Sequence, residues 1–279
     1  MAKNIIVVTG ASSGMGRAFA KKIVKKEKVD EIWVIARRLN LLEELKDEIT
    51  ECKVVPLQID LRDKAQINEV YKKRLEEEKP VIKVLGCCAG FGKFAHFERI
   101  DLQTEIDMVD VNFSAYMIMT YLSIPYMANP SNIMMIASGS SSQPVPYQTV
   151  YGATKAAVLS FARSMNRELK YKGIHVLAVV PLWVQNTFMD TAIDPNMNPV
   201  VLNYTGTYKG ADVMDRAIKD LYTKKDVSKL GFYNKFQHAV VKILPHKWIM
   251  NIWFKQNKLD GTPEVRKEKD VKIKGLNRE

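Results

Sequence analysis

Two side chains suited to proton transfer, Tyr151 and Lys155, stand four residues apart in the chain. In a helix, positions i and i+4 share a face, so the phenol and the ammonium group would point into one site. A nearby cation favours the phenolate and lowers the pKa of a tyrosine, which makes its hydroxyl usable as a proton donor or acceptor. Because a surface pair has the same spacing, the interpretation depends on the elements that place these residues.

A glycine-rich segment, Thr-Gly-Ala-Ser-Ser-Gly-Met-Gly at residues 9–16, joins an apolar β-branched run to a helical stretch. A strand, a tight turn and a helix N-terminus form an anion cradle, because backbone N–H groups and the helix dipole both face the ligand. Glycine permits the turn and a close backbone approach to a pyrophosphate. The spacing is Gly-x3-Gly-x-Gly, and a plain loop is the alternative interpretation. The candidate phosphate-binding residues are Gly10, Ser12, Ser13, Gly14, Met15 and Gly16.

Apolar strand-like runs alternate with helical stretches over much of the chain. The expected strands cover 4–8, 31–36, 52–57, 82–88, 132–137 and 174–180, and the expected helices lie near 14–28, 40–50, 63–78, 103–128 and 150–172. This alternation implies right-handed β-α-β crossovers and therefore an α/β fold with a doubly wound parallel sheet. Ligands of such sheets bind at the carboxyl ends of the strands.

These motifs together resemble those of the short-chain dehydrogenase/reductase family, which has a Rossmann fold. The family's glycine motif matches residues 9–16, and its Tyr-x3-Lys motif matches Tyr151 and Lys155. Its catalytic serine, thirteen residues before the tyrosine, matches Ser138, and its catalytic asparagine matches Asn112. The resemblance is good over roughly residues 3–190 and poor beyond them.

The resemblance implies hydride transfer between a nicotinamide and a carbonyl carbon. Tyr151 would exchange a proton with the alcohol oxygen, Ser138 would hydrogen-bond that oxygen, and Lys155 would lower the pKa of Tyr151 and bind the ribose hydroxyls. Asn112, in a helix that the family kinks at this point, would hold a water that links Lys155 to solvent. A serine-rich turn and an ordinary helix polar residue are the plain alternatives for Ser138 and Asn112.

Further cofactor contacts follow from the same resemblance. Asp60 and Leu61 would flank the adenine, and Val184 would approach the nicotinamide carboxamide. Thr187 would lie near the pyrophosphate on its nicotinamide side, with Asn186 as its rival. The family's Asn-Asn-Ala-Gly and Pro-Gly motifs add Ala89, Gly90 and Pro181 as cofactor contacts. Both motifs are altered here. Cys87 and Cys88 stand in place of the two asparagines, and Leu182 stands in place of the glycine after Pro181. We expect the two cysteines to be small buried apolar residues.

The second expected strand ends in two arginines, Arg37 and Arg38, and no acidic residue occurs between Ile32 and Leu42. An acidic side chain there would accept a hydrogen bond from the ribose 2′-hydroxyl and favour NAD. Guanidinium groups instead suit a 2′-phosphate, to which they make charge-assisted hydrogen bonds. The sequence therefore predicts NADP(H) as the cofactor, and two solvated arginines are the alternative.

The bulk composition fits one large core, because the chain has 279 residues of which 47% are hydrophobic. No stretch approaches the ~18 consecutive apolar residues of a transmembrane helix. The three cysteines and four histidines show no metal-binding or disulfide spacing, so a reducing cytoplasm is expected. We expect one catalytic domain over residues 1–235, with a substrate lid at about 182–210, and a helical extension with a charged tail over 236–279.

The expected extension is strongly basic. Residues 224–258 hold eight lysines and one acidic residue, which is +7 of the formal net charge of +11. A helical wheel separates a polar stripe from an apolar one, which are Lys247, Asn251, Lys255 and Lys258 against Trp248, Ile249, Ile252 and Trp253. Such a helix can lie in a membrane interface, with its lysines on anionic lipid. Cover for the pocket or for a subunit interface is the favoured alternative, and nucleic-acid binding is disfavoured because no recognition module is present.

The expected lid is rich in Met, Phe, Leu, Val and Tyr and has no cluster of basic residues. An apolar pocket follows, with Tyr147 and Phe188 as substrate contacts beside Ser138 and Tyr151. It suits a bulky lipophilic ketone or alcohol such as a hydroxysteroid or a bile acid. The tail and the run at 143–147 also resemble hydroxysteroid dehydrogenases and long-chain ketoacyl reductases.

Two other functions stay open at this point. A 3-oxoacyl-thioester reductase is the second interpretation, and a non-catalytic NADP-binding regulator is the third. The family's habit of packing the helices near 103–128 and 150–172 between subunits implies a homodimer or homotetramer.

Overall fold

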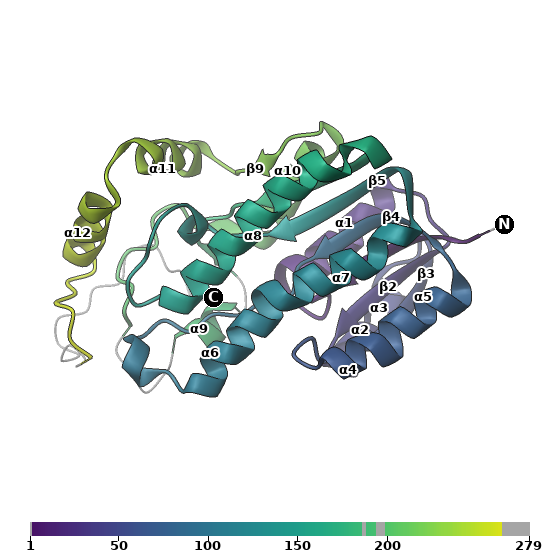
Figure 1. Cartoon of the computed structure of the whole chain (residues 1–279), viewed down its shortest axis with the longest axis horizontal. Coiled ribbons are helices and arrows are strands. Elements are labelled where there is room, and N and C mark those ends of the chain that lie inside the picture. The colour runs from purple at the N-terminus through teal and green to yellow at the C-terminus, as the bar shows by residue number, and fades with distance from the viewer. Residues whose placement is uncertain (1, 186–187, 194–198, 264–279) are drawn as a thin grey trace.

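The computed structural model describes residues 2–185, 188–193 and 199–263 (Figure 1). Within these ranges, seven parallel strands form one sheet in the order β3-β2-β1-β4-β5-β6-β9, and β7 pairs with β8 in a second, two-stranded sheet. The strands are β1 Asn4–Thr9, β2 Glu31–Ala36, β3 Lys53–Gln58, β4 Val81–Cys87, β5 Met127–Ile136, β6 Ile174–Val179, β7 Val184–Gln185, β8 Tyr208–Lys209 and β9 Val227–Ser228.

Helices connect the strands and extend beyond the sheet. They are α1 Gly14–Lys26, α2 Leu39–Glu43, α3 Leu45–Glu48, α4 Lys64–Gln66, α5 Lys73–Glu78, α6 Leu102–Val109, α7 Ala115–Ser123, α8 Thr149–Glu168, α9 Phe188–Ala192, α10 Gly210–Tyr222, α11 Phe232–Ile243 and α12 His246–Gln256. Among the residues described, no helix has both the length and the apolar character that crossing a membrane would need.

Helices bury both faces of the sheet. Ile5 and Val7 of β1 pack into a core shared with α5, α7 and α8, whereas Ile6 and Val8 pack into a core shared with α1 and α10. Successive strand residues point to opposite faces, so a strand covered on both sides must be continuously apolar. This explains why the strand segments read as unbroken apolar runs.

The predicted doubly wound parallel fold is confirmed. The six predicted strands agree with the structure to within one residue at each end, except that β5 begins at Met127 instead of residue 132. The helix expected over 40–50 is divided at Glu44, and those over 63–78 and 103–128 contain π-helical turns at Ile67–Lys72 and Asp110–Ser114. No local pattern predicted β7, β8 and β9, because strands of two residues are too short to show a period.

The C-terminal helices α11 and α12 lie beyond one end of the sheet (Figure 1), and hydrogen bonds attach them to the catalytic part of the chain. Asn234 Nδ2 donates to the carbonyl of Val180, just beyond β6, at 2.7 Å. Asn257 Oδ1 accepts the N–H of Leu202 at 2.8 Å, which joins the end of α12 to the segment before β8. The domain boundary predicted at residue 235 falls inside α11, and the division into a catalytic domain and an extension stays a prediction.

A buried carboxylate, Glu31, ties the amino ends of three neighbouring strands together. Its oxygens accept hydrogen bonds from Trp33 Nε1 at 3.1 Å, Lys3 Nζ at 3.0 Å and Lys53 Nζ at 3.1 Å. Burial by itself would raise the pKa of Glu31, but these hydrogen bonds outweigh it and lower the pKa to about 2.

We therefore predict an acid-dependent loss of stability that Glu31→Gln removes. Because the pKa of Glu31 is depressed in the folded state, its contribution is present above the ordinary value of 4.5 and is lost as the pH falls towards 2. Over that interval the wild type should lose about 3 kcal/mol more unfolding free energy than the variant. Urea unfolding at several pH values measures this. Equal pH dependence of the two proteins would contradict it, and Glu77→Gln, at an exposed ion pair, is the control.

Candidate active site

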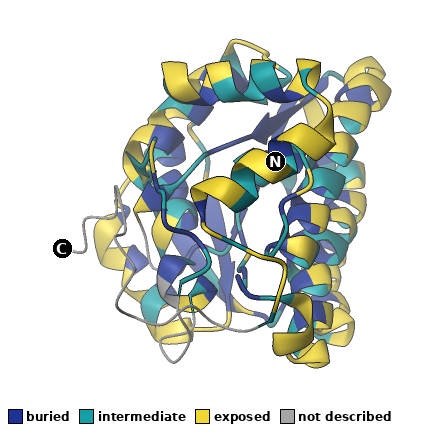
Figure 2. Cartoon of the chain, turned by 90° about the vertical axis from the view of Figure 1, so that its left-hand side faces the viewer, coloured by how far each residue is buried: buried dark blue, intermediate teal, exposed yellow. Residues whose placement is uncertain are grey.

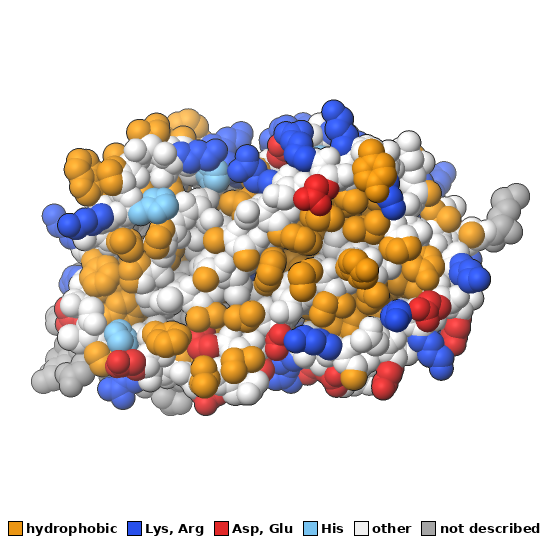
Figure 3. Space-filling view, in the orientation of Figure 1, with side chains coloured by type: hydrophobic (Ala, Val, Ile, Leu, Met, Phe, Trp, Pro, Cys, Tyr) orange, Lys and Arg blue, Asp and Glu red, His pale blue; other side chains and the backbone are white. Residues whose placement is uncertain are grey.

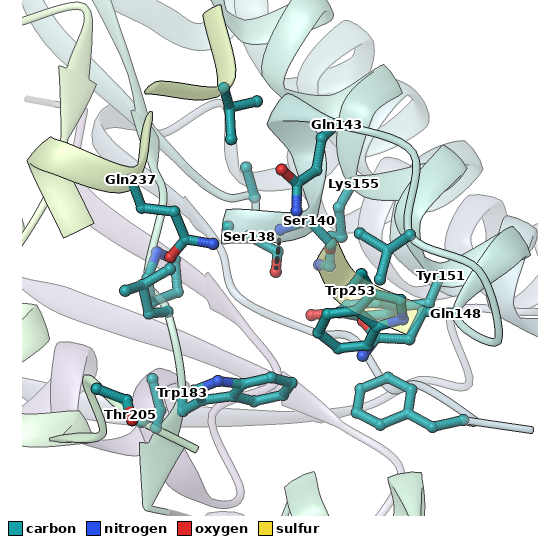
Figure 4. A pocket seen from close by; sticks show the side chains of 18 of the residues that line it. Ser138, Ser140, Gln143, Gln148, Tyr151, Lys155, Trp183, Thr205, Gln237 and Trp253 are labelled. Carbon is teal, nitrogen blue, oxygen red and sulfur yellow. Dashed lines mark hydrogen bonds between the residues drawn. The ribbon is translucent and has the colours of Figure 1, made fainter. Parts of the chain in front are cut away.

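The carboxyl ends of β5 and β6, the loop after β4 and the first turns of α8 surround a cavity of about 250 Å³ (Figure 4). Ser138, Tyr151 and Lys155 line it on one side, and residues from α11 and α12 line it on another. Side chains from both halves of the chain therefore meet in one space. Of the four predicted catalytic residues, three lie in the cavity wall and Asn112 lies behind it.

Tyr151 and Lys155 lie one turn apart on the inner face of α8, and both are buried. Lys155 Nζ donates to the carbonyl of Ile136 at 2.9 Å and lies 5.9 Å from the ring centre of Tyr151. The ring of Phe188 lies 5.5 Å from that of Tyr151, and the ring of Phe94 lies 5.6 Å from it. The pair thus forms part of a largely apolar wall instead of a surface contact.

Burial moves both pKa values towards the neutral forms. It raises the pKa of Tyr151 to about 12, although a hydrogen bond with the Ser138 hydroxyl acts in the opposite direction. Burial also lowers the pKa of Lys155 to about 8. The net pKa of Tyr151 is therefore raised and not lowered as predicted, because loss of hydration outweighs the hydrogen bond with Ser138.

Asn112 holds the loop after β4 against α8. Its Oδ1 accepts the N–H of Phe91 at 3.0 Å, and its Nδ2 donates to the carbonyl of Phe91 at 2.9 Å and to Thr154 Oγ1 at 3.2 Å. It lies in the π-helical turn Asp110–Ser114, which interrupts the regular α-helix at the place where the resemblance implies a kink. The expected water link to Lys155 stays a prediction, because the polar atoms of Asn112 are bonded to protein groups here.

The glycine-rich loop has the shape that an anion site needs. A Cβ on Gly10 would lie 2.6 Å from the Cα of Ala89, and one on Gly16 would lie 2.2 Å from the carbonyl oxygen of Gly10, so only glycine fits at either position. Among the described residues no side chain caps the start of α1, and its first turn has no acidic residue. The first N–H groups of α1 are therefore free to bind an anion, which fits the pyrophosphate of a dinucleotide.

Arg38 lies over this loop. Its Nη2 donates to Ser12 Oγ at 3.1 Å and to Ser13 Oγ at 2.9 Å, which places a cation beside the predicted phosphate residues. Arg37 is exposed next to it. Asp60 is held by the Arg62 guanidinium, whose hydrogen bonds lower the pKa of that carboxyl, and Leu61 is buried.

The other predicted cofactor contacts also lie at this edge. Met15, Gly90, Pro181 and Val184 line the cavity, together with Cys88, which is only partly buried and does not pack fully into the sheet as expected. The carbonyl of Ala89 accepts a hydrogen bond from the Tyr116 hydroxyl at 2.7 Å. Thr187 and its rival Asn186 lie outside the described residues.

Of the two further predicted substrate contacts, Tyr147 and Phe188, only one lines the cavity. Phe188 lines the cavity beside Tyr151. Tyr147 does not line it, and its hydroxyl donates to the carbonyl of Thr262 at 2.8 Å while its ring contacts Phe254. Tyr147 therefore joins the loop after β5 to the C-terminal segment, and we withdraw it as a substrate contact.

Several cavity residues were missed from the sequence. Ser140 Oγ, Gln143 Oε1 and Gln148 Nε2 are buried cavity-lining atoms that have no hydrogen-bond partner in the described part of the chain. Trp253 of α12 reaches the cavity and donates to the carbonyl of Pro146 at 3.1 Å. The apolar stripe of α12 was the available signal for Trp253, whereas nothing in the local pattern distinguishes the glutamines.

Comparisons with known proteins identify the family of this chain. A family model described as short chain dehydrogenase matches residues 4–198. The chain therefore belongs to the short-chain dehydrogenase family of oxidoreductases.

Three relatives illustrate the range of similarity. The chain is 28% identical over 267 residues to a very-long-chain 3-oxoacyl-CoA reductase of Anas platyrhynchos, a match that covers 90% of this chain and 79% of the relative. It is 33% identical over 189 residues to an NADP-dependent 3-hydroxy acid dehydrogenase of Salmonella typhi, covering 66% and 73%. The solved structure of a bulky-bulky ketone specific alcohol dehydrogenase from Comamonas testosteroni is 25% identical, with a TM-score of 0.65 and coverage of 86% and 94%.

We predict that Asn112→Ala destabilises the site and the fold together. The change leaves the N–H and the carbonyl of Phe91 without their partner, which should cost about 2–4 kcal/mol of unfolding free energy. Asn112→Asp keeps the oxygen that accepts the N–H of Phe91 and should lose less unfolding free energy than Asn112→Ala. Urea unfolding measures both, and Asn68→Ala, at an exposed asparagine bonded to Lys64, is the control. An Asn112→Ala protein as stable as the wild type would contradict this role.

Proposed function

We propose that this protein is an NADP(H)-dependent oxidoreductase that transfers a hydride between the nicotinamide and the carbonyl or secondary alcohol of a lipophilic substrate. The observation that carries the proposal is the position of Ser138, Tyr151 and Lys155 together in the wall of a cavity with largely apolar surroundings. A proton donor, a hydrogen-bonding hydroxyl and a cation converge there on the space where a carbonyl oxygen would lie.

The side chains have complementary roles. When bound, the nicotinamide supplies or accepts the hydride at the substrate carbon. In the reducing direction the carbonyl oxygen gains negative charge and must take a proton, which Tyr151 can give because its raised pKa keeps it protonated at neutral pH. The Ser138 hydroxyl holds the same oxygen in place. Lys155 is a cation below about pH 8 and stabilises the phenolate that forms on Tyr151.

The choice of NADP(H) is supported by Arg38, whose guanidinium lies beside the Ser12 and Ser13 hydroxyls at the start of α1. A 2′-phosphate at this place would receive charge-assisted hydrogen bonds from one or both arginines. The 3-hydroxy acid dehydrogenase relative is described as NADP-dependent, which agrees with the proposal.

For the substrate, a bulky ketone such as an oxosteroid or oxo bile acid is the first candidate. Trp183, Phe188 and Trp253 provide broad apolar walls, and the unpaired atoms of Ser140, Gln143 and Gln148 suit a substrate with polar groups besides the reacting carbonyl. The similar alcohol dehydrogenase from Comamonas testosteroni is described as specific for bulky-bulky ketones.

A 3-oxoacyl thioester is the second candidate. The match to the very-long-chain 3-oxoacyl-CoA reductase covers 90% of this chain, which is more than the 4–198 segment that the family model matches. The unpaired Gln148 Nε2 could donate to the second carbonyl of a 3-oxoacyl group.

We also propose that α6 and α7 pack between subunits. They expose large apolar side chains, which are Leu102, Ile106, Val109, Met117 and Tyr121, and Figure 3 shows apolar side chains over this part of the molecule. Exposed apolar area of this kind is typical of subunit interfaces.

The proposed reaction predicts substrate-dependent NADPH oxidation. Purified protein should oxidise NADPH in the presence of one of two groups of ketones, which are oxosteroids with oxo bile acids, and 3-oxoacyl-CoA thioesters. The group that is reduced faster identifies the substrate class. Tyr151→Phe should lower kcat at least ~100-fold, because it removes the proton donor, while NADPH affinity stays within a few-fold. No turnover with any ketone would leave a non-catalytic NADP-binding protein, and an active Tyr151→Phe variant would refute the mechanism.

The cofactor assignment predicts a selective effect at Arg38. Arg38→Ala should raise KM for NADPH by about 10–100-fold, since it removes charge-assisted hydrogen bonds to the 2′-phosphate. KM for NADH, which lacks that phosphate, should change much less. Arg37→Ala, measured alongside, shows whether the exposed neighbour shares the role. Equal changes for the two cofactors would exclude a 2′-phosphate site at Arg38.

A further inference from the structure

The outer surfaces of α11 and α12 expose an unusual number of large apolar side chains. Phe232 and Ile243 are 82% and 81% exposed, and Phe236, Trp248 and Ile252 are each about half exposed or more. Phe232 and Phe236 stack on each other with their ring centres 6.2 Å apart. Figure 3 shows these helices as an apolar region at the upper left of the molecule, and Figure 2 shows the outward faces of the same side as exposed. We call this set the apolar outer face.

On α11 the helical period separates this face from the cavity side. Phe232, Phe236 and Ile243 are spaced by four and seven residues and therefore share one stripe. Gln237, Val240 and Val241 lie on another stripe and line the cavity. Phe232, Phe236 and Ile243 are thus not needed to close the catalytic cavity. Covering the pocket therefore explains the cavity-lining residues of α11 and α12, but it does not explain the exposed apolar residues on their outer surfaces.

Lysines flank the apolar outer face. Lys235 and Lys242 lie on α11, and Lys247 and Lys255 lie on α12. Residues 227–258 contain no acidic residue at all, and none of these four lysines forms an ion pair with any residue that the structure describes. By comparison, Lys3, Lys21, Lys22 and Lys53 each pair with a carboxylate.

The cations also gather at the base of α11. Lys229 lies close enough to Lys242 and Arg163 for them to add to the effect of burial, which lowers the pKa of Lys229 to about 8. His238, which is hydrogen-bonded to Ser142 Oγ at 2.8 Å, faces the same three cations. An anionic surface would relieve this repulsion, and a neutral apolar partner would not.

The cavity opens beside this surface. Tyr233 of α11 and Ile252 of α12 are partly exposed and also line the cavity, so they form part of its rim. A lipophilic molecule dissolved in a bilayer could pass this rim without crossing water.

We propose that α11 and α12 dock the protein on the surface of an anionic phospholipid bilayer, with Phe232, Phe236, Ile243 and Trp248 among the headgroups and the flanking lysines on lipid phosphates. Aromatic and apolar side chains beside lysines are the combination that interfacial helices use. Charge complementarity selects the lipid surface over a second copy of this chain, because a second copy would bring the same lysines to the contact. The proposal concerns where the protein works and does not depend on which ketone it reduces.

Vesicle co-sedimentation of the full chain tests the proposal. We expect binding to vesicles of equimolar phosphatidylcholine and phosphatidylglycerol to be at least ~10-fold tighter than to phosphatidylcholine alone, and to weaken as salt is added. The variant Phe232→Ser/Phe236→Ser/Ile243→Ser should reduce binding at least ~10-fold. The variant Lys235→Gln/Lys242→Gln/Lys247→Gln/Lys255→Gln should lose the preference for anionic lipid.

Tyr171→Ser is the matched control. Tyr171 is 81% exposed and has Lys172 over its ring, but it lies after α8 and away from the apolar outer face. Its substitution should leave vesicle binding unchanged. Circular dichroism and NADPH binding verify that each variant is folded.

Two results would overturn the proposal. One is a folded wild type that does not bind anionic vesicles. The other is a triple serine variant that binds them as the wild type does, and if its oligomeric mass also falls in light scattering, this face is a subunit interface. Since the readout is binding, neither result bears on the reductase activity.

Discussion

The contact between the loop after β1 and the loop after β4 sets the geometry of the whole carboxyl edge. Thr9 Oγ1 accepts the N–H groups of Cys88 at 3.1 Å and Ala89 at 3.3 Å, and Gly10 packs against Ala89 with no space for a Cβ. β1 and β4 lie side by side at the point where the strand order of the sheet reverses. This contact therefore fixes the glycine-rich loop at residues 9–16 relative to the strands β4, β5 and β6, whose carboxyl ends lie beside the catalytic cavity.

The catalytic residues depend on further links that start from the same place. The Tyr116 hydroxyl holds the carbonyl of Ala89, and Asn112 holds both backbone groups of Phe91 while also donating to Thr154 of α8. The loop after β4 is therefore attached to the helix that carries Tyr151 and Lys155. The same packing removes water from both side chains, which is why their pKa values move towards the neutral forms.

The C-terminal helices combine two roles that composition alone did not separate. Their inner residues complete the cavity, and buried hydrogen bonds from Asn234 and to Asn257 hold them in place. Their outer residues and lysines remain available for a partner. Substrate entry and any surface attachment would then depend on the same two helices.

The sequence by itself determined the elements and the local chemistry. Apolar periodicity located the six long strands, the glycine spacing located the phosphate loop, and the i, i+4 spacing of Tyr151 and Lys155 placed them on one helix face, because each of these signals is local to a few turns or residues. Only the tertiary structure decided the sign of the pKa shift at Tyr151, the displacement of Tyr147 from the cavity towards Thr262, and the split of α11 into a cavity side and an outer side. Burial, hydration and the choice of partner depend on residues far apart in the chain, and no local pattern contains them.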